Sequence, residues 1–190
     1  MASSTADPRP RFASQRLRAE PVELRHAAAM SQVLADPRIH ELLPSDPPTV
    51  AYLERQYAFL AGGKSSDGTE HWLTWILVPN EGPADPVGYV QATIKEPESV
   101  IIAYVMSPAH WRKGLAREAT AAMLDTVFAR YDVACAIAEM DTRNEASIRL
   151  VESLGFRRTD TVYDAASFKG STSHEHVYRI TKDEWSARKT

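Results

Sequence analysis

Residues 100–130 contain the local pattern that narrows the choice of folds most. The run Val100–Met106 is almost entirely apolar, as expected of a strand that is buried on both faces. Pro108 ends this run, and Gly114–Arg130 then has the apolar spacing of an amphipathic helix. A buried strand followed by a short turn and a helix indicates a protein that mixes α and β structure.

Patterns of the same kind predict the remaining elements. Upstream, we predict a strand at Arg16–Ala19, helices at Val22–Leu34 and Thr49–Leu60, and strands at His71–Val78 and Val87–Lys95. Downstream, we predict a strand at Val133–Met140, a helix at Asn144–Leu154, and strands at Arg157–Tyr163 and His174–Thr181. The three central strands should form an antiparallel meander. The order predicts one mixed α/β domain over residues 15–190, after a disordered leader over residues 1–14.

The composition excludes several classes of protein. Of 190 residues, 44% are hydrophobic and 25% are charged, which is ordinary for one globular domain. The net charge of −3 does not provide the positive surface of a general nucleic-acid binder. The single cysteine, Cys135, cannot form an internal disulfide, and no apolar run is long enough to cross a membrane. We therefore expect a cytoplasmic protein that binds neither nucleic acid nor membrane.

The turn before the predicted helix has the features of a pyrophosphate site. The first backbone N–H groups of a helix have no helical partners, and they lie at the positive end of the helix dipole. Gly114 and Ala116 would let the backbone approach a ligand closely. Arg112, Lys113 and Arg117 add positive charge to the same turn, although they could also be a solvated helix start.

Two segments carry a resemblance to a known family. The sequence from Trp111 to Ala116 is similar to motif A of the GNAT superfamily of N-acetyltransferases, [Gln/Arg]-x-x-Gly-x-[Gly/Ala], with Trp111 in place of Gln or Arg. Motif A with a tryptophan at its first position resembles the branch of the family that includes the ribosomal-protein alanine N-acetyltransferases. The segment Asn144–Phe156 resembles motif B, in which Asn-x-x-Ser is followed by a helix and Gly-Phe.

The resemblance implies a fold and a cofactor. It implies a mostly antiparallel twisted sheet flanked by helices, whose fourth and fifth strands are parallel and splayed apart. Acetyl-CoA would bind between those strands as a cosubstrate, without a metal, and a homodimer is expected from the family. An N–H near Val105 or Met106 would stabilise the oxyanion. The implied cofactor-binding residues are Val105, Met106, Ser107, Trp111, Arg112, Lys113, Gly114, Leu115, Ala116, Arg117 and Asn144.

The catalytic residues are less well marked. Many family members carry a tyrosine as general acid seven residues after the motif B asparagine, where this chain has Val151. Ser147 is the best substitute acid, although it could equally be a capping or surface residue. Family members often use a Glu on the fourth or a neighbouring strand as the base, but Val100–Met106 contains no carboxylate. The resemblance therefore leaves Glu139, Glu98 and Glu175 as candidates, and we single out Glu139, although it could also be a solvated strand terminus. Asn144 could likewise serve only as a helix cap.

The expected activity is acetyl transfer to a primary amine, either a protein N-terminus or a small molecule. One alternative is a catalytically degenerate acyl-CoA-binding regulatory module, and another is an interaction protein without a cofactor. His174 and His176 share one strand face but have no further ligands nearby in sequence, so we predict no metal site. The acceptor side should be lined by the first two helices, the loop Pro44–Pro48 and the connection Tyr163–Thr172.

Overall fold

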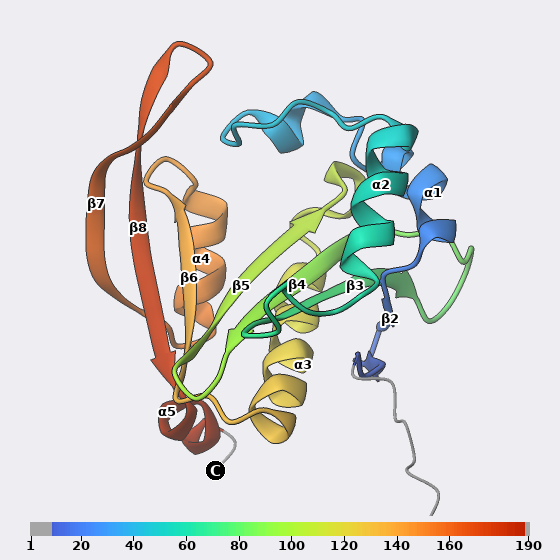
Figure 1. Cartoon of the computed structure of the whole chain (residues 1–190). Coiled ribbons are helices and arrows are strands. Elements are labelled where there is room, and N and C mark those ends of the chain that lie inside the picture. The colour runs from blue at the N-terminus through green and yellow to red at the C-terminus, as the bar shows by residue number, and fades with distance from the viewer. Residues whose placement is uncertain (1–8, 189–190) are drawn as a thin grey trace, which may run out of the picture.

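Strands from every part of the chain join one twisted sheet in the computed structural model, which describes residues 9–188 (Figure 1). Their order across the sheet is β1-β2-β3-β4-β5-β6-β8-β7. The strands are β1 (Phe12–Ala13), β2 (Leu17–Pro21), β3 (His71–Pro79), β4 (Gly88–Lys95), β5 (Ser99–Met106), β6 (Cys135–Asp141), β7 (Arg157–Phe168) and β8 (Ser171–Thr181). The helices are α1 (Ala27–Val33), α2 (Val50–Leu60), α3 (Leu115–Arg130), α4 (Glu145–Ser153) and α5 (Lys182–Ala187), with short 3₁₀ helices η1 (Leu24–His26), η2 (Pro37–His40) and η3 (Pro108–His110).

The predicted mixed α/β fold is confirmed, including its one parallel strand pair. Strands β3, β4 and β5 form the expected antiparallel meander. Strands β5 and β6 run parallel and pair only from Ser99↔Cys135 to Ile102↔Ala138. Beyond that pair the two strands part, and a gap opens between their carboxyl ends (Figure 1). These are the strands predicted as fourth and fifth, since β1 adds a strand at the start.

Two hydrophobic cores cover the two faces of the sheet. Side chains alternate along β3, so that Trp75 and Leu77 face the core shared with α3. Ile76 and Val78 face the opposite core, which is shared with α1 and α2. Both cores are densely buried, and Trp75 and Ile76 are fully inaccessible. Burial of each such side chain stabilises the fold by about 1.5–3 kcal/mol.

The start of the chain differs from the prediction of a disordered leader over residues 1–14. Residues 9–14 are placed, and β1 pairs with β2 through Phe12↔Ala19. The Phe12 ring packs edge-on against Trp75 at 5.2 Å, and Trp75 Nε1 donates a hydrogen bond to the carbonyl of Pro10 (2.6 Å). The buried indole needs this acceptor, which explains why the segment is ordered. Residues 1–8 lie outside the described residues.

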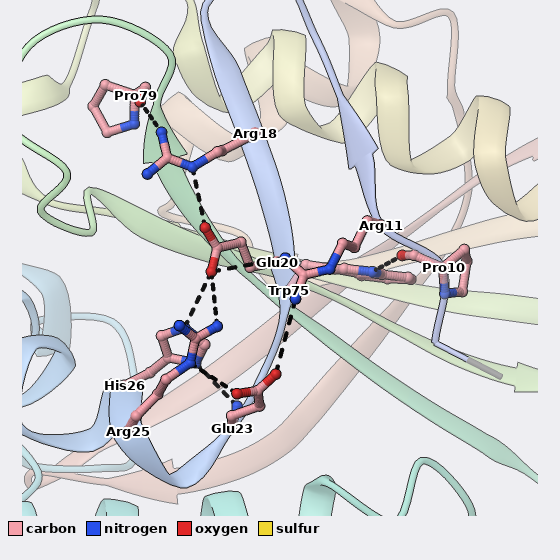
Figure 2. A network of polar contacts seen from close by, with 9 residues as sticks. All are labelled: Pro10, Arg11, Arg18, Glu20, Glu23, Arg25, His26, Trp75 and Pro79. Carbon is pink, nitrogen blue, oxygen red and sulfur yellow. Dashed lines mark hydrogen bonds and ion pairs between the residues drawn. The ribbon is translucent and has the colours of Figure 1, made fainter. Parts of the chain in front are cut away.

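A network of charged side chains fixes the edge of the sheet to the first helical turns (Figure 2). The carboxylate of Glu20 on β2 accepts hydrogen bonds from Arg18 Nε and Arg25 Nη2, both at 3.1 Å. His26 Nε2 lies 3.6 Å from the same carboxylate, and Arg11 lies 3.9 Å from it. Burial alone would raise the pKa of Glu20, but the hydrogen bond from Arg18 and the surrounding arginine charges lower it overall. Glu20 therefore stays ionised and holds η1 against β2.

The end of the chain contains more regular structure than predicted. Strands β7 and β8 extend into a long hairpin whose tip is Lys169-Gly170, where we predicted an irregular connection over Tyr163–Thr172. The β7 segment is mostly exposed and its pairing has two register irregularities, so the alternation that marks a strand is weak. Helix α5 was not predicted either. Its signal is the capping box formed by Thr181 and Glu184.

Candidate active site

The turn from β5 into α3 is shaped by two left-handed residues. Arg112 has a φ of 58° and Gly114 a φ of 76°, and Gly114 is the N-cap of α3. Gly114 has no side chain that could accept a hydrogen bond, so the N-cap residue leaves the first N–H groups of the helix without a side-chain cap. Glycine is the residue that adopts this conformation without steric cost. The turn predicted from the sequence is therefore present, with its N-terminal donors uncapped.

A salt bridge that the sequence did not reveal holds this turn in place. Arg16, immediately before β2, donates to the Glu118 carboxylate from its backbone N and from Nε, both at 2.7 Å. Arg16 Nη1 also donates to the carbonyl of Lys113 (2.9 Å). Burial alone would raise the pKa of Glu118, but hydrogen bonds from Ser14 and Arg16 lower it overall. The pair thus ties the first turn of α3 to the edge of the sheet.

Trp111 braces the end of β5. Its Nε1 donates to the carbonyl of Met106 (2.6 Å), and the Arg38 guanidinium lies 5.6 Å from the centre of the ring. The side chain is 41% exposed. The tryptophan that replaces the usual Gln or Arg of motif A therefore positions the strand end in this structure.

Backbone hydrogen bonding distinguishes the three candidate amides at the end of β5. The Ser107 N–H donates to the carbonyl of Val87 (2.8 Å), so it is already used within the sheet. Because N–H groups alternate sides along a strand, the Val105 N–H also points toward β4. The Met106 N–H points the other way, into the gap between β5 and β6. Of the two predicted oxyanion donors, Val105 and Met106, the N–H of Met106 is therefore the one that faces the gap between β5 and β6.

The start of α4 is a rigid corner. Asn144 Oδ1 accepts from the Ser147 N–H (3.1 Å), so Asn144 is the N-cap of α4. The buried carboxylate of Asp141 accepts from Arg143 Nε (2.8 Å) and Nη2 (2.6 Å) and from Ser173 Oγ (2.7 Å). The hydrogen bond from Arg143 is the main reason that the pKa of Asp141 lies far below its usual value. Asp141 is therefore a fixed anion and a poor base.

Tyr104 is a further site candidate, which the motifs do not mark. It lies on β5 and is half-buried, and its hydroxyl donates to the carbonyl of Ser147 (3.3 Å). Burial raises the pKa of Tyr104 to about 12, although the hydrogen bond to Ser147 acts in the opposite direction. The phenol therefore bridges β5 and the first turn of α4 in its neutral form. Alternation along β5 could have placed it on this face, but its contact with α4 is visible only in the fold.

The three candidate bases occupy different places. Glu98 precedes β5, at the end of the sheet away from the gap, and lies 3.7 Å from Lys95 Nζ. Glu139 is exposed on β6 and directly follows the last β5–β6 pair. Glu175 on β8 is half-buried and lies opposite Asp141. Glu139 and Glu175 thus share the sheet face opposite α3 and α4, next to the gap, whereas Glu98 is remote from it.

Charged residues of motif A lie at the start of α3, and one of them contacts α4. Arg117 on α3 donates from Nε to Ser153 Oγ at the end of α4 (3.2 Å). Arg112 and Lys113 are exposed in the turn itself. Leu115 is buried in the core and Ala116 is half-buried against it, so both contribute backbone rather than side chain to the turn. The positive charge predicted from the sequence is therefore gathered around the start of α3.

A cavity of about 590 Å³ lies on the other face of the sheet, between α1, α2 and strands β3–β5. Its lining includes the loop after η2 and residues of α2, which are among the segments that we expect to line the acceptor side. At the tip of the β7–β8 hairpin, Lys169 Nζ donates to the carbonyls of His40 (2.6 Å) and Ser45 (3.3 Å). The helices, the loop and the hairpin therefore meet around one site.

Metal-binding groups are absent from residues 9–188, where no three His, Cys, Asp or Glu side chains gather suitably. His174 Nδ1 accepts from the Asp164 N–H (3.0 Å). His176 Nδ1 lies 2.9 Å from Thr161 Oγ1, and both histidines thus have protein partners. Among the helices of the described chain, none is long and apolar enough to span a membrane.

Comparisons with known proteins show which family the chain belongs to. The family model described as "Acetyltransferase (GNAT) domain" matches residues 16–157. The "Uncharacterized N-acetyltransferase p20" of Bacillus licheniformis is 23% identical over 172 residues, which are 90% of this chain and 96% of that protein.

Solved structures share the fold. Ribosomal-protein-S5-alanine acetyltransferase from Vibrio fischeri superposes with a TM-score of 0.79 at 16% identity, covering 93% of this chain and 98% of that one. Mycobacterium smegmatis RimJ in complex with a CoA disulfide superposes with a TM-score of 0.80 at 19% identity, covering 94% and 90%. Because the family model spans most of the chain and the observed fold agrees with it, this protein belongs to the GNAT family of acetyltransferases and is an acyltransferase.

Proposed function

We propose that this protein transfers an acetyl group from acetyl-CoA directly to a primary amine, which is either a protein N-terminus or a small molecule. The observation that carries the proposal is the uncapped, left-handed turn at the start of α3, which adjoins the gap between β5 and β6. Such a turn offers backbone donors and a positive helix dipole to a diphosphate. The gap gives a thioester access to the sheet face where an acceptor can approach.

The chain's own residues divide the binding of the cofactor between them. The amides that follow Arg112 hold the diphosphate, and Lys113 and Arg117 supply positive charge around it. Gly114 keeps the turn in its left-handed form. Asn144 fixes the first turn of α4, beside which the pantetheine arm would lie. Bound acetyl-CoA supplies the activated acetyl group.

Two groups of the protein would act on the reacting atoms, and a third would position one of them. The Met106 N–H donates to the carbonyl oxygen as negative charge develops there. The Ser147 hydroxyl donates a hydrogen bond to the departing sulfur, whose thiol resembles that of cysteine and needs only a weak acid. Tyr104 positions the first turn of α4 through its bond to the Ser147 carbonyl.

Glu139 is the proposed base, directly or through a water, and Glu175 is the alternative on the same sheet face. The attacking amine must lose a proton before or during attack. A protein N-terminus has a reference pKa of about 7.7–8.0 and a lysine amine one of about 10.4. An exposed carboxylate beside the gap is therefore adequate help for an N-terminal amine, which is already partly neutral near pH 7.5.

A thiol-release assay tests the proposal. The full chain is incubated with acetyl-CoA and a panel of peptides and small amines, and CoA binding is measured in parallel by calorimetry. We expect release of CoA that depends on the acceptor, together with acetylation of its amine. Tight CoA binding without turnover across the panel would instead indicate the regulatory module. The absence of any CoA binding would contradict both the acetyltransferase and the regulatory module, and would favour an interaction protein.

Two further expectations belong to this proposal. We propose a cytoplasmic location, because a chain with one cysteine has no internal disulfide that requires an oxidising compartment. We also propose a homodimer on the strength of the family resemblance. Sedimentation of the purified chain tests the second expectation.

A further inference from the structure

The cavity of about 590 Å³ reaches the strand residues beside the proposed reacting centre. Its inner wall contains Tyr89 and Gln91 of β4 and Val105 of β5. Val105 directly precedes Met106, whose amide points into the gap between β5 and β6. A molecule seated in the cavity would therefore have one end next to the thioester, and the volume is typical of a small-molecule site.

The cavity walls are apolar and carry little charge. Leu34 and Leu53 supply buried apolar surface. Among the lining residues of the described chain, Asp46 and Arg55 carry full charges, and both are exposed. The Asp46 carboxylate also lies 3.8 Å from Lys169 Nζ, which balances its charge. An ammonium group deep in this cavity would have no carboxylate partner, which makes its burial costly.

Two phenols add uncharged polar groups to the walls. Burial raises the pKa of Tyr89 to about 12. Burial, together with the nearby Tyr89, also raises the pKa of Tyr57. Gln91 Nε2 donates to Thr74 Oγ1 (2.9 Å), which fixes the amide on the same wall. These groups can hydrogen-bond a hydroxyl or an amide of an occupant, but they offer no charge to neutralise a cation.

The cavity walls offer little negative charge, but two carboxylates lie on the other side of the gap between β5 and β6. Because Ile102↔Ala138 is the last β5–β6 pair, Glu139 stands directly beyond it. Alternation places Glu139 and Glu175 on the same face of the sheet as the cavity. One ammonium group at the gap therefore has carboxylates near it, while the rest of the same molecule lies against uncharged walls.

We propose that this cavity is the specificity pocket for the acceptor, and that it selects amines with one amino group and an uncharged apolar or aromatic body. The inference rests on the proposed function, because it names the acceptors of that same site. A small arylalkylamine fits this description, and so does a peptide whose first residue has a large apolar side chain. Polyamines and aminoglycosides carry several ammonium groups and do not fit it.

Steady-state kinetics of the full chain with matched acceptors test the selectivity. One pair is phenylethylamine and putrescine, and the other is two peptides that differ only in an N-terminal Phe or Lys. We expect kcat/KM to be about tenfold higher for the apolar member of a pair. The pair that is turned over more efficiently distinguishes a small-molecule acceptor from a peptide.

A charge placed on the wall provides a second test. Gln56 is an exposed lining residue, so Gln56→Glu introduces a carboxylate of nearly the same size. Gln32→Glu is the matched control, because Gln32 is exposed on α1 and does not line the cavity. We expect Gln56→Glu to reduce the preference for phenylethylamine over putrescine about fivefold, and Gln32→Glu to leave it unchanged. Neither variant should change the KM for acetyl-CoA or the melting temperature.

The outcomes separate this inference from the proposed function. Equal or higher kcat/KM for the multiply charged acceptors would overturn the selectivity and leave the acetyltransferase standing. An unchanged preference in Gln56→Glu would do the same. Absence of turnover with every acceptor would overturn the proposed function and this inference with it.

Discussion

Gly114 is the residue whose conformation the proposed cofactor site depends on most. A side chain at its φ of 76° is strained, and a Cβ there would lie 3.5 Å from Arg16 Nη2. We expect Gly114→Glu to weaken CoA binding more than about 100-fold in calorimetry, because the new carboxylate would repel the diphosphate. Gly82→Glu is the control, since Gly82 has a φ of 84° but no neighbour within 4 Å. Equal loss of binding in both variants would contradict the role assigned to this turn.

The Arg16–Glu118 pair gives a second prediction at the residue scale. Arg16→Ala removes the side-chain bonds to Glu118 and to the Lys113 carbonyl but keeps the backbone bond to Glu118, so the turn should loosen. We expect CoA affinity to fall about tenfold, with an interaction energy of about 1–2 kcal/mol between Arg16→Ala and Glu118→Gln in a double-mutant cycle. Arg25→Ala, which removes pairs with Glu20 and Glu23, neither of which contacts the turn, should leave CoA affinity unchanged. Additive effects of the two site variants would argue against a coupled pair.

Asp141 gives a prediction about pH. The Arg143 hydrogen bond depresses the pKa of Asp141 in the folded protein, whereas an unfolded Asp titrates near its reference value of about 3.9. Its contribution to stability is therefore complete above about pH 4 and is lost as the pH falls toward the folded pKa. We expect Asp141→Asn to lower the free energy of unfolding by about 2 kcal/mol at pH 7, and by less at pH 3, in urea titrations. An effect that is the same at both pH values would refute this account.

Local patterns revealed some of these residues and not others. Gly114 and the Asn144 cap were predictable because a glycine turn and an Asn-x-x-Ser helix start are signals within a few residues. The contacts of Arg16 with Glu118 and of Tyr104 with Ser147 join distant parts of the chain. Nothing local marks such a contact, so the fold is needed to find it.

At the scale of elements, the predictions held where periodicity was strong. The meander β3–β5 and helix α3 were found because buried strands and long helices have clear patterns. Strand β1 was missed because it has only two residues, Phe12–Ala13, which are too few to show an alternating pattern. Its place in the sheet depends on the packing of the Phe12 ring against Trp75, a residue far away in the sequence. The outer half of the β7–β8 hairpin was missed because neither face of β7 is buried.

The contact between the hairpin tip and the η2 loop gives a prediction for a pair of elements. Lys169 donates to the carbonyls of His40 and Ser45, beside the proposed acceptor cavity. We expect Lys169→Ala to raise the KM for the acceptor about threefold to tenfold, because the loop wall would become mobile, with CoA affinity unchanged. Hydrogen exchange over residues 40–48 should speed up in parallel. Lys95→Ala, at the opposite end of the sheet, is the control, and an unaltered acceptor KM in Lys169→Ala would refute the contact's role.

At the scale of the whole molecule, the proposed function uses the gap between β5 and β6 to connect two sites on opposite faces of the sheet. The start of α3 and the corner of α4 form one site, and the cavity under α1 and α2 forms the other. Helices α1 and α2 cover one face of the sheet and α3 covers the other, each over its own hydrophobic core (Figure 1). We therefore expect that substitutions around the cavity leave the turn that would bind the cofactor undisturbed. Short motifs mark the turn before α3 and the start of α4, whereas no local pattern marks the cavity, so the sequence predicts the acceptor only by class.

A crystal structure of the full chain with CoA is the most direct test of the central claim. The account predicts that the diphosphate lies at the start of α3, within hydrogen-bond distance of the amides that follow Arg112, and that the thiol lies in the gap near Met106. CoA bound elsewhere on the chain, with this turn unoccupied or filled by a side chain, would contradict it.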